Sequence, residues 1–146
     1  KPLLELERQI DDLKRIGSER QNDIEGELQG LQGKLESLRA EIMGLEDRLY
    51  AQIQIYAKGI AAPGLYDTNT YPYWFKDLNG NGLGEPNELV SSNGYRFAAP
   101  LLRGAYNLHF SKKEPCSYIH NALYFAQLLV DSIGHLGGDV SPFTWR

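Results

Sequence analysis

Residues 28–53 have the sequence LQGLQGKLESLRAEIMGLEDRLYAQI. The large apolar residues recur in alternating steps of three and four, at Leu28, Leu31, Leu35, Leu38, Ile42, Leu45 and Leu49. Ile53 continues this apolar stripe. Glu, Lys and Arg occupy many of the positions between them. This sustained a/d spacing is the pattern of a coiled-coil helix. We therefore predict a long helix over residues 3–58 whose apolar face needs a partner.

A second seam of the same kind, formed by Leu6, Ile10 and Leu13, lies upstream. The two seams do not share a register, because joining them requires two successive steps of four residues. One explanation is a single helix with a stutter in its repeat. The other is a break near Gly17, where the chain reverses and a new helix begins. We expect a continuous or gently broken helix.

The composition changes after this helix. Residues 1–60 hold most of the charged residues, whereas residues 61–146 hold most of the Tyr, Trp, Phe, Gly and Pro. We therefore predict two domains: a coiled-coil helix over residues 1–60 and an aromatic-rich helical lobe over residues 61–146. Within the lobe we expect a helix over about 100–110, a turn over 112–115 and a terminal helix over about 117–136. The predicted fold class is mainly α.

The lobe contains the run DLNGNGLGEPNE at residues 77–88, which has the ligand spacing of an EF-hand-like calcium loop. Oxygen-bearing side chains fall at positions 1, 3, 5, 9 and 12, and Gly82 stands at position 6, where the chain must turn sharply. The predicted ligands are the side chains of Asp77, Asn79, Asn81, Glu85 and Glu88 and the backbone carbonyl of Leu83. With three acidic groups, such a site suits a structural role in a calcium-rich compartment.

Two residues depart from the usual loop pattern. Gly84 stands at position 8, where a β-branched apolar residue is usual, and Pro86 at position 10 discourages a helix from starting inside the loop. The alternative interpretation is an ordinary surface turn, because Asn-Gly is by itself a strong turn signal.

Several functional classes are disfavoured by composition. The formal net charge of −4 argues against nucleic acid as a main partner. The sequence contains no run of about 18 apolar residues, so it predicts no transmembrane helix. The single cysteine, Cys116, allows no internal disulfide and no Cys-x-x-Cys motif, and we expect it to be buried and inert. No catalytic set is suggested by the spacing of His109, His120 and His135, so we predict that the chain is not an enzyme.

The chain resembles the C-terminal, haem-free region of large bacterial multihaem c-type cytochromes. The resemblance rests on YWFKDLNGNG at residues 73–82, Ala105-Tyr106-Asn107, Lys113-Glu114-Pro115, His120-Asn121 with Tyr124, and QLLVDSI at residues 127–133. The family commonly has Asp-Pro-Gly where this chain has Glu114-Pro115-Cys116. The chain has no Cys-x-x-Cys-His and so does not attach haem c itself.

The resemblance implies a periplasmic or extracellular bacterial electron-transfer assembly. In it, the chain contributes calcium-stabilised structure and a coiled-coil docking surface for a multihaem cytochrome subunit or for its own copies. His120, at the family's His-Asn position, is then the candidate axial ligand to a haem c held by another polypeptide or by another part of the same one. The competing hypothesis is a calcium-binding coiled-coil oligomerisation module with no role in electron transfer.

Overall fold

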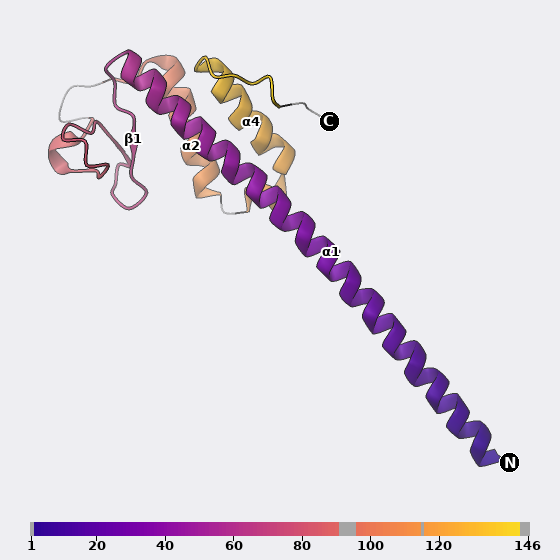
Figure 1. The fold of residues 1–146 in the computed structure, drawn as a ribbon. Helices are drawn as coiled ribbons and strands as arrows, with labels where there is room; N and C mark the ends of the chain where they lie inside the picture. Colours follow the sequence, from indigo (N-terminus) through magenta and orange to yellow (C-terminus); the bar gives the residue numbers. More distant parts are fainter. Residues whose placement is uncertain (1, 91–95, 115, 144–146) are drawn as a thin grey trace. The chain divides into compact units, whose positions relative to one another are not determined.

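The computed structural model describes residues 2–90, 96–114 and 116–143. Its elements, in chain order, are α1 (Pro2–Gly59), β1 (Leu65–Tyr66), β2 (Trp74–Phe75), the 3-10 helix η1 (Pro86–Glu88), α2 (Ala99–Lys113), α3 (Ser117–His120) and α4 (Ala122–His135) (Figure 1). The prediction of a mainly helical fold with a long N-terminal helix is confirmed. No described helix has both the length and the apolarity that crossing a bilayer requires.

Helix α1 runs through Gly17 without interruption, so the predicted alternative of a break there is wrong. The chain nevertheless forms two compact units, residues 1–38 and residues 39–146. The second unit therefore includes the last part of α1, although the composition changes only after residue 60. The division into a coiled-coil domain and a lobe at that residue stays a prediction.

The apolar stripe of α1 is buried in one section and exposed in another. In the first unit, the stripe is exposed at Ile10, Leu13, Ile24, Leu28, Leu31, Leu35 and Leu38. Leu31, for example, is 61% exposed. In the second unit, Ile42, Leu45, Leu49, Ile53 and Ala57 are all buried. The side chain of Leu6 lies outside the described residues. The heptad pattern thus supplies the core of one unit and an uncovered face on the other.

The core of the second unit forms where this section of α1 lies alongside α2 and α4 (Figure 1). Leu49 and Ile53 pack there with Leu101 and Leu108 of α2 and Leu129 of α4, all fully buried. Polar contacts also join the helices to one another, and two of them involve α1. The amide Nε2 of Gln52 donates to the carbonyl of Leu136 over 2.8 Å, and the Ser111 hydroxyl donates to the buried Glu46 carboxylate over 2.5 Å. Each of them gives a hydrogen-bond partner to a polar group that would otherwise be buried without one.

Helix α2 begins as its sequence predicts and ends later. Pro100 stands in the first turn, where its missing N–H costs nothing. The predicted turn over residues 112–115 is wrong for Lys112 and Lys113, which form the last turn of α2, while residue 115 lies outside the described residues. Basic side chains favour a helix C-terminus because they face the negative end of its dipole.

The predicted terminal helix over residues 117–136 is interrupted at Asn121. This residue has φ −161° and ψ 70°, so it cannot continue a helix. Its side-chain oxygen accepts a hydrogen bond from the N–H of Tyr124 over 3.1 Å and thereby caps α4. The break separates α3, which ends at His120, from α4, which carries the buried apolar face.

A two-stranded antiparallel sheet connects α1 to the rest of the lobe. Leu65 pairs with Phe75 and Tyr66 with Trp74. The N–H of Tyr66 donates to the Tyr50 hydroxyl on α1 over 3.1 Å, which fixes β1 to the helix. Phe75 also bridges to Leu89, so the segment between residues 75 and 89 closes into a loop.

The two sections of the α1 stripe should respond differently to the same substitution. Leu49→Ala, at a fully buried site, should lower the free energy of unfolding by about 2–5 kcal/mol, because it leaves a cavity in the core. Leu31→Ala, at an exposed site of the same repeat, should change it by less than about 0.5 kcal/mol in a dilute sample of the chain. Denaturant titration followed by circular dichroism measures both, and equal losses would contradict this division of the stripe.

Candidate functional site

The segment predicted as a calcium loop lies between β2 and η1. Gly80 and Gly82 have φ of 75° and 74°, left-handed values that glycine adopts without strain. The loop therefore turns sharply near its midpoint. It is entered from a strand and followed by a 3-10 helix of three residues, with Pro86 at its start. No helix–loop–helix surrounds it.

The carboxylate of Asp77 organises the first half of the loop. Its Oδ1 accepts hydrogen bonds from the N–H groups of Gly80, at 2.7 Å, and Asn81, at 3.2 Å. Its Oδ2 accepts from the N–H of Gly82 at 3.0 Å. Three amides thus converge on one carboxylate, which fixes the curvature of the backbone around it.

The two asparagines and Glu85 interact across the loop. The side-chain oxygen of Asn79 accepts from the N–H of Asn81, and that of Asn81 accepts from the N–H of Leu83. Their amide nitrogens donate to the two oxygens of Glu85, over 2.8 Å from Asn79 and 3.2 Å from Asn81. The predicted ligand side chains Asn79, Asn81 and Glu85 therefore lie close together. In this arrangement the two asparagines are hydrogen-bonded to Glu85.

Glu88 is the buried member of the predicted set. It is 0% exposed, and its Oε1 accepts from the N–H of Leu78 at 2.7 Å and of Asn79 at 3.4 Å. Its second oxygen, Oε2, is buried and has no hydrogen-bond partner. An unpaired carboxylate oxygen is costly to bury, so this position is the one in the loop where a cation would supply a missing interaction.

The arrangement fits an oxygen-coordinated ion only in part. Within the residues that the structure describes, no three His, Cys, Asp or Glu side chains come together as a metal-binding group. Calcium also accepts amide and backbone carbonyl oxygens as ligands. For Asn79 and Asn81 to serve as ligands, however, their side-chain amides must turn. The amide oxygens would then face an ion bound between them and Glu85, in place of the nitrogens that now donate to Glu85.

The absence of a side chain at Gly84 has a structural cause. A Cβ there would lie 2.5 Å from Cε2 of Phe75, so the Phe75 ring occupies the space that an apolar residue at position 8 would fill. The N–H of Gly84 donates to Oδ2 of Asp67 over 3.2 Å. Backbone hydrogen bonds from Asn69 and Gly84 lower the pKa of the Asp67 carboxyl. Asp67 and Phe75 thus fix the far side of the loop to the sheet.

The candidate haem ligand His120 lies at the end of α3 and not inside the terminal helix. Its side chain is 68% exposed, and its Nδ1 is 3.5 Å from Oε1 of Glu114. The same Glu114 oxygen accepts from the N–H of Cys116 over 3.3 Å. Cys116 is partly exposed, so the expectation of a buried thiol is wrong. The structure presents the His120 imidazole on the surface with a carboxylate beside one ring nitrogen.

His109 lies in a more structured environment than the sequence predicts. Its Nδ1 is 2.9 Å from the hydroxyl of Tyr66, and its ring lies 5.0 Å from the ring of Tyr73. Burial lowers its pKa, and the nearby charge of Lys113 lowers it further. No sequence signal could have identified this pair, because Tyr66 and His109 are 43 residues apart.

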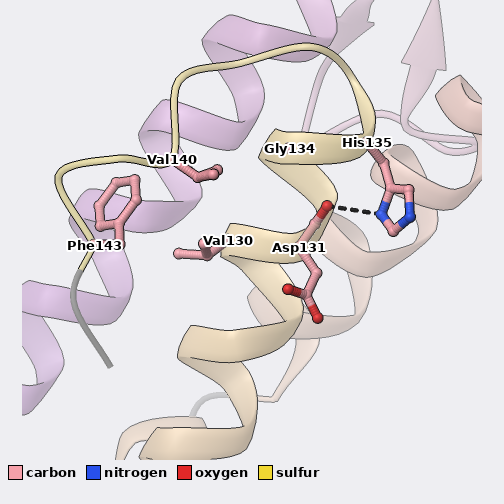
Figure 2. Close-up of a pocket in the computed structure, with 6 residues that line it drawn as sticks. All are labelled: Val130, Asp131, Gly134, His135, Val140 and Phe143. Atoms are coloured by element: carbon pink, nitrogen blue, oxygen red, sulfur yellow. Dashed lines mark hydrogen bonds between the residues drawn. The ribbon is translucent and has the colours of Figure 1, made fainter. Parts of the chain in front are cut away.

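His135 borders a shallow pocket of about 290 Å³ at the end of α4. Figure 2 shows its imidazole directed away from Val140 and Phe143, with Nδ1 bonded to the backbone carbonyl of Asp131 over 2.8 Å. Because a carbonyl can only accept, Nδ1 of His135 carries the proton. The ring is thus held by its own helix and does not line the apolar side of the pocket.

Comparison with known proteins identifies relatives of this chain. Over 120 residues, 73% of the chain, it is 32% identical to "C-type polyheme cytochrome OmcB" of Geobacter sulfurreducens, in strains DL-1/KN400 and PCA. It is 31% identical to "C-type polyheme cytochrome OmcC" of strain PCA, again over 73% of the chain. The match covers 16% of OmcB and 15% of OmcC, so the chain spans a small part of these relatives. No protein-family model matches the chain, and no solved structure does.

The lowered pKa of His109 predicts a pH-dependent stability. Unfolding returns the imidazole to its ordinary pKa near 6.5, so below that pH the unfolded chain binds more protons than the folded one. The contribution of this group is present above pH 6.5 and is lost as the pH falls through the folded pKa. Denaturant titrations between pH 7.5 and 5 should show a smaller loss of stability for His109→Gln than for the unmodified chain. Parallel profiles for the two proteins would contradict the assignment.

Proposed function

Because the chain is homologous to a region of the large polyhaem c-type cytochromes, we propose that it is a haem-free, non-catalytic component of a multihaem electron-transfer assembly. The observation that carries the proposal is the 32% identity over 73% of the chain. The single cysteine means that every haem c of this assembly is attached elsewhere, on a partner subunit or on another part of a longer polypeptide. The chain's part is to position and support those haems.

Calcium binding at Asp77–Glu88 belongs to this proposal. It is supported by the buried, unpartnered Oε2 of Glu88 and by the sharp turn at Gly82. Ion binding would require the Asn79 and Asn81 amides to exchange their contacts with Glu85 for contacts with the ion. Since only three carboxylates are present, the site suits a calcium-rich periplasmic or extracellular location better than the cytosol.

Docking through the exposed section of α1 is the second part of the proposal. Apolar residues at a/d spacing between Ile10 and Leu38 remain exposed in the chain by itself. A helix with such a face is stabilised when another helix covers it. The cover is another copy of the chain or a helix of the haem-bearing polypeptide.

Haem ligation by His120 is the third part. The imidazole is exposed, and Glu114 stands beside its Nδ1. A ligating histidine commonly donates its second ring N–H to a carboxylate or carbonyl, which fixes its tautomer and orientation. Nε2 of His120 would then be the nitrogen that meets an iron held by the haem-bearing polypeptide.

The calcium part predicts a melting temperature that depends on the ion. Calcium should raise the melting temperature of the chain and a chelator should lower it, because an ion bound only to the folded state adds about 2.7 kcal/mol at 100 times its Kd. The shift should disappear in Glu88→Gln and in Asp77→Ala, and it should persist in Asp131→Ala, an exposed carboxylate on α4. A melt that is indifferent to both calcium and chelator would leave the loop as an ordinary turn.

The cytochrome proposal predicts the visible spectrum of the natively purified assembly. It should show the absorption bands of low-spin haem c, and His120→Ala should alter them while His135→Ala should not. A colourless, cytochrome-free assembly would refute the electron-transfer role and would favour a calcium-binding coiled-coil module. A coloured assembly with an unchanged spectrum in His120→Ala would refute only the ligand assignment.

A further inference from the structure

The exposed apolar stripe in the first unit of α1 has a pattern that is the same in both chain directions. Ile10 and Leu13 are three residues apart, and so are Leu28 and Leu31. Leu13 lies as far before the midpoint between residues 20 and 21 as Leu28 lies beyond it, and the same is true of Ile10 and Leu31. Three further pairs in the sequence share this relation: Leu3 with Leu38, Leu6 with Leu35, and Gly17 with Ile24. The two seams, which do not share a register within one chain, are therefore related by reversal of the chain direction.

Two copies of α1 that run in opposite directions would therefore match along this stripe. With a two-fold axis at the midpoint, Leu13 of one copy would face Leu28 of the second, and Ile10 would face Leu31. These side chains are exposed in the chain by itself, Leu13 by 68% and Leu28 by 53%. Steps of three residues would face steps of three, so the side chains of the two helices could interdigitate throughout.

The length of the match is sufficient for a stable pair. Pairing over residues 3–38 covers about 54 Å of helix, or about five heptads. A coiled coil is recognised from about three to four sustained heptads.

The middle of the stripe, where the repeat is irregular, also suits a reversed copy. Gly17 would face Ile24 of the second copy, so a residue without a side chain would lie opposite a large apolar one. A Cβ at Gly17 would meet nothing within 4 Å in the chain by itself, so the space beside it is open. Nearest the axis, the Arg20 guanidinium would donate to the side-chain oxygen of Gln21. A polar layer of this kind fixes the register of a coiled coil.

The charges beside the stripe complement one another in the antiparallel pair. Lys14 directly follows Leu13, and Glu25 directly follows Ile24, so both lie on the same side of the stripe. In the pair they would lie between the same two layers of apolar residues. The two-fold axis would form the contact between Lys14 and Glu25 twice.

A parallel copy in register fits the same sequence less well. It would place Lys34 beside Arg39 of the second copy, and these like charges repel. It would also set Gly17 opposite Gly17 and leave a gap in the core. Arg15 does not affect this choice, because it bonds to Glu19 of its own helix over 3.1 Å on the outer face.

We propose that the partner of the exposed section of α1 is a second copy of this chain, bound antiparallel about the midpoint between Arg20 and Gln21. This inference rests on the docking part of the proposed function and names its partner. The symmetric match ends at Leu38, the last exposed position of the stripe, because Ile42 is already buried by the chain's own helices. The second copy would thus cover the section of the stripe that the chain leaves uncovered.

Sedimentation equilibrium of the full chain tests for the partner. The 16.5 kDa chain should sediment as a dimer in the micromolar range. Leu31→Asp should return it to a monomer, and Gln29→Asp, which lies off the stripe, should leave it dimeric. Circular dichroism melts show whether each variant is folded. A monomeric parent chain would overturn the inference, and so would a folded Leu31→Asp chain that stays dimeric.

Cysteine cross-linking tests the orientation in the Cys116→Ser background, which removes the chain's only cysteine. Mild oxidation of a mixture of Leu13→Cys chains and tagged Leu28→Cys chains should give a mixed disulfide dimer. Leu13→Cys chains alone should remain uncross-linked. Cross-linking of Leu13→Cys chains to one another, without the mixed product, would show a parallel pair and overturn the inference.

Charge exchange tests the register. Lys14→Glu should weaken the dimer about 3–30-fold, because it turns two attractive contacts into two repulsions, and adding Glu25→Lys should restore the affinity. Lys34→Glu is the matched control: it should change the affinity by less than about threefold in the antiparallel pair, whereas it would strengthen a parallel pair by removing a repulsion. A double exchange that fails to restore the dimer would contradict the register. None of these results decides the electron-transfer role, which depends on the haem content of the native assembly.

Discussion

The second unit depends on the packing of one face of α1, from Ile42 to Ala57, against α2 and α4. These residues form one side of its buried cluster, and the remainder comes mainly from α2 and α4, which also contact one another directly, for example through the hydrogen bond from Asn107 to Ser132. The sheet has only two short strands, which cannot be stable by themselves. It is fixed to the helices through the Tyr66–Tyr50 hydrogen bond and the contact between Tyr66 and His109. The position of the sheet, and of the loop that follows it, therefore depends on the packing of these helices.

The sequence predicted this face but not what covers it. Periodicity reports which side of a helix is apolar, and it is equally regular at Leu31 and at Leu49. Only the structure shows that the chain's own helices cover Leu49 and leave Leu31 exposed. The break at Asn121 was missed for a related reason: its apolar neighbours continue the helical pattern, while the side chain competes for the backbone N–H of Tyr124. Local hydrogen bonding prevailed there over periodicity.

The candidate sites divide in the same way. The ligand spacing of residues 77–88 is a local property, so the sequence identified the loop and its turn. The role of Gly84 is not local, because the Phe75 ring that fills its place comes from the preceding strand. Among the histidines, the His-Asn motif singled out His120 as the candidate ligand. In the structure, His109 is the histidine with more contacts to other side chains. Tyr66 and Tyr73 reach that ring from segments outside α2, which no spacing rule can anticipate, whereas Lys113 lies four residues after His109 on the same helix.

The loop is continuous in structure with an aromatic cavity whose lining includes Tyr73, Trp74 and His109. Strand β2 supplies Trp74 to the wall of the cavity, and its next residue, Phe75, packs on Gly84 of the loop. Asp67 bonds to Gly84 on one side and, through its N–H, to the carbonyl of Tyr73 on the other. An ion that ordered the loop would therefore also restrain Tyr73, whose left-handed backbone needs such support.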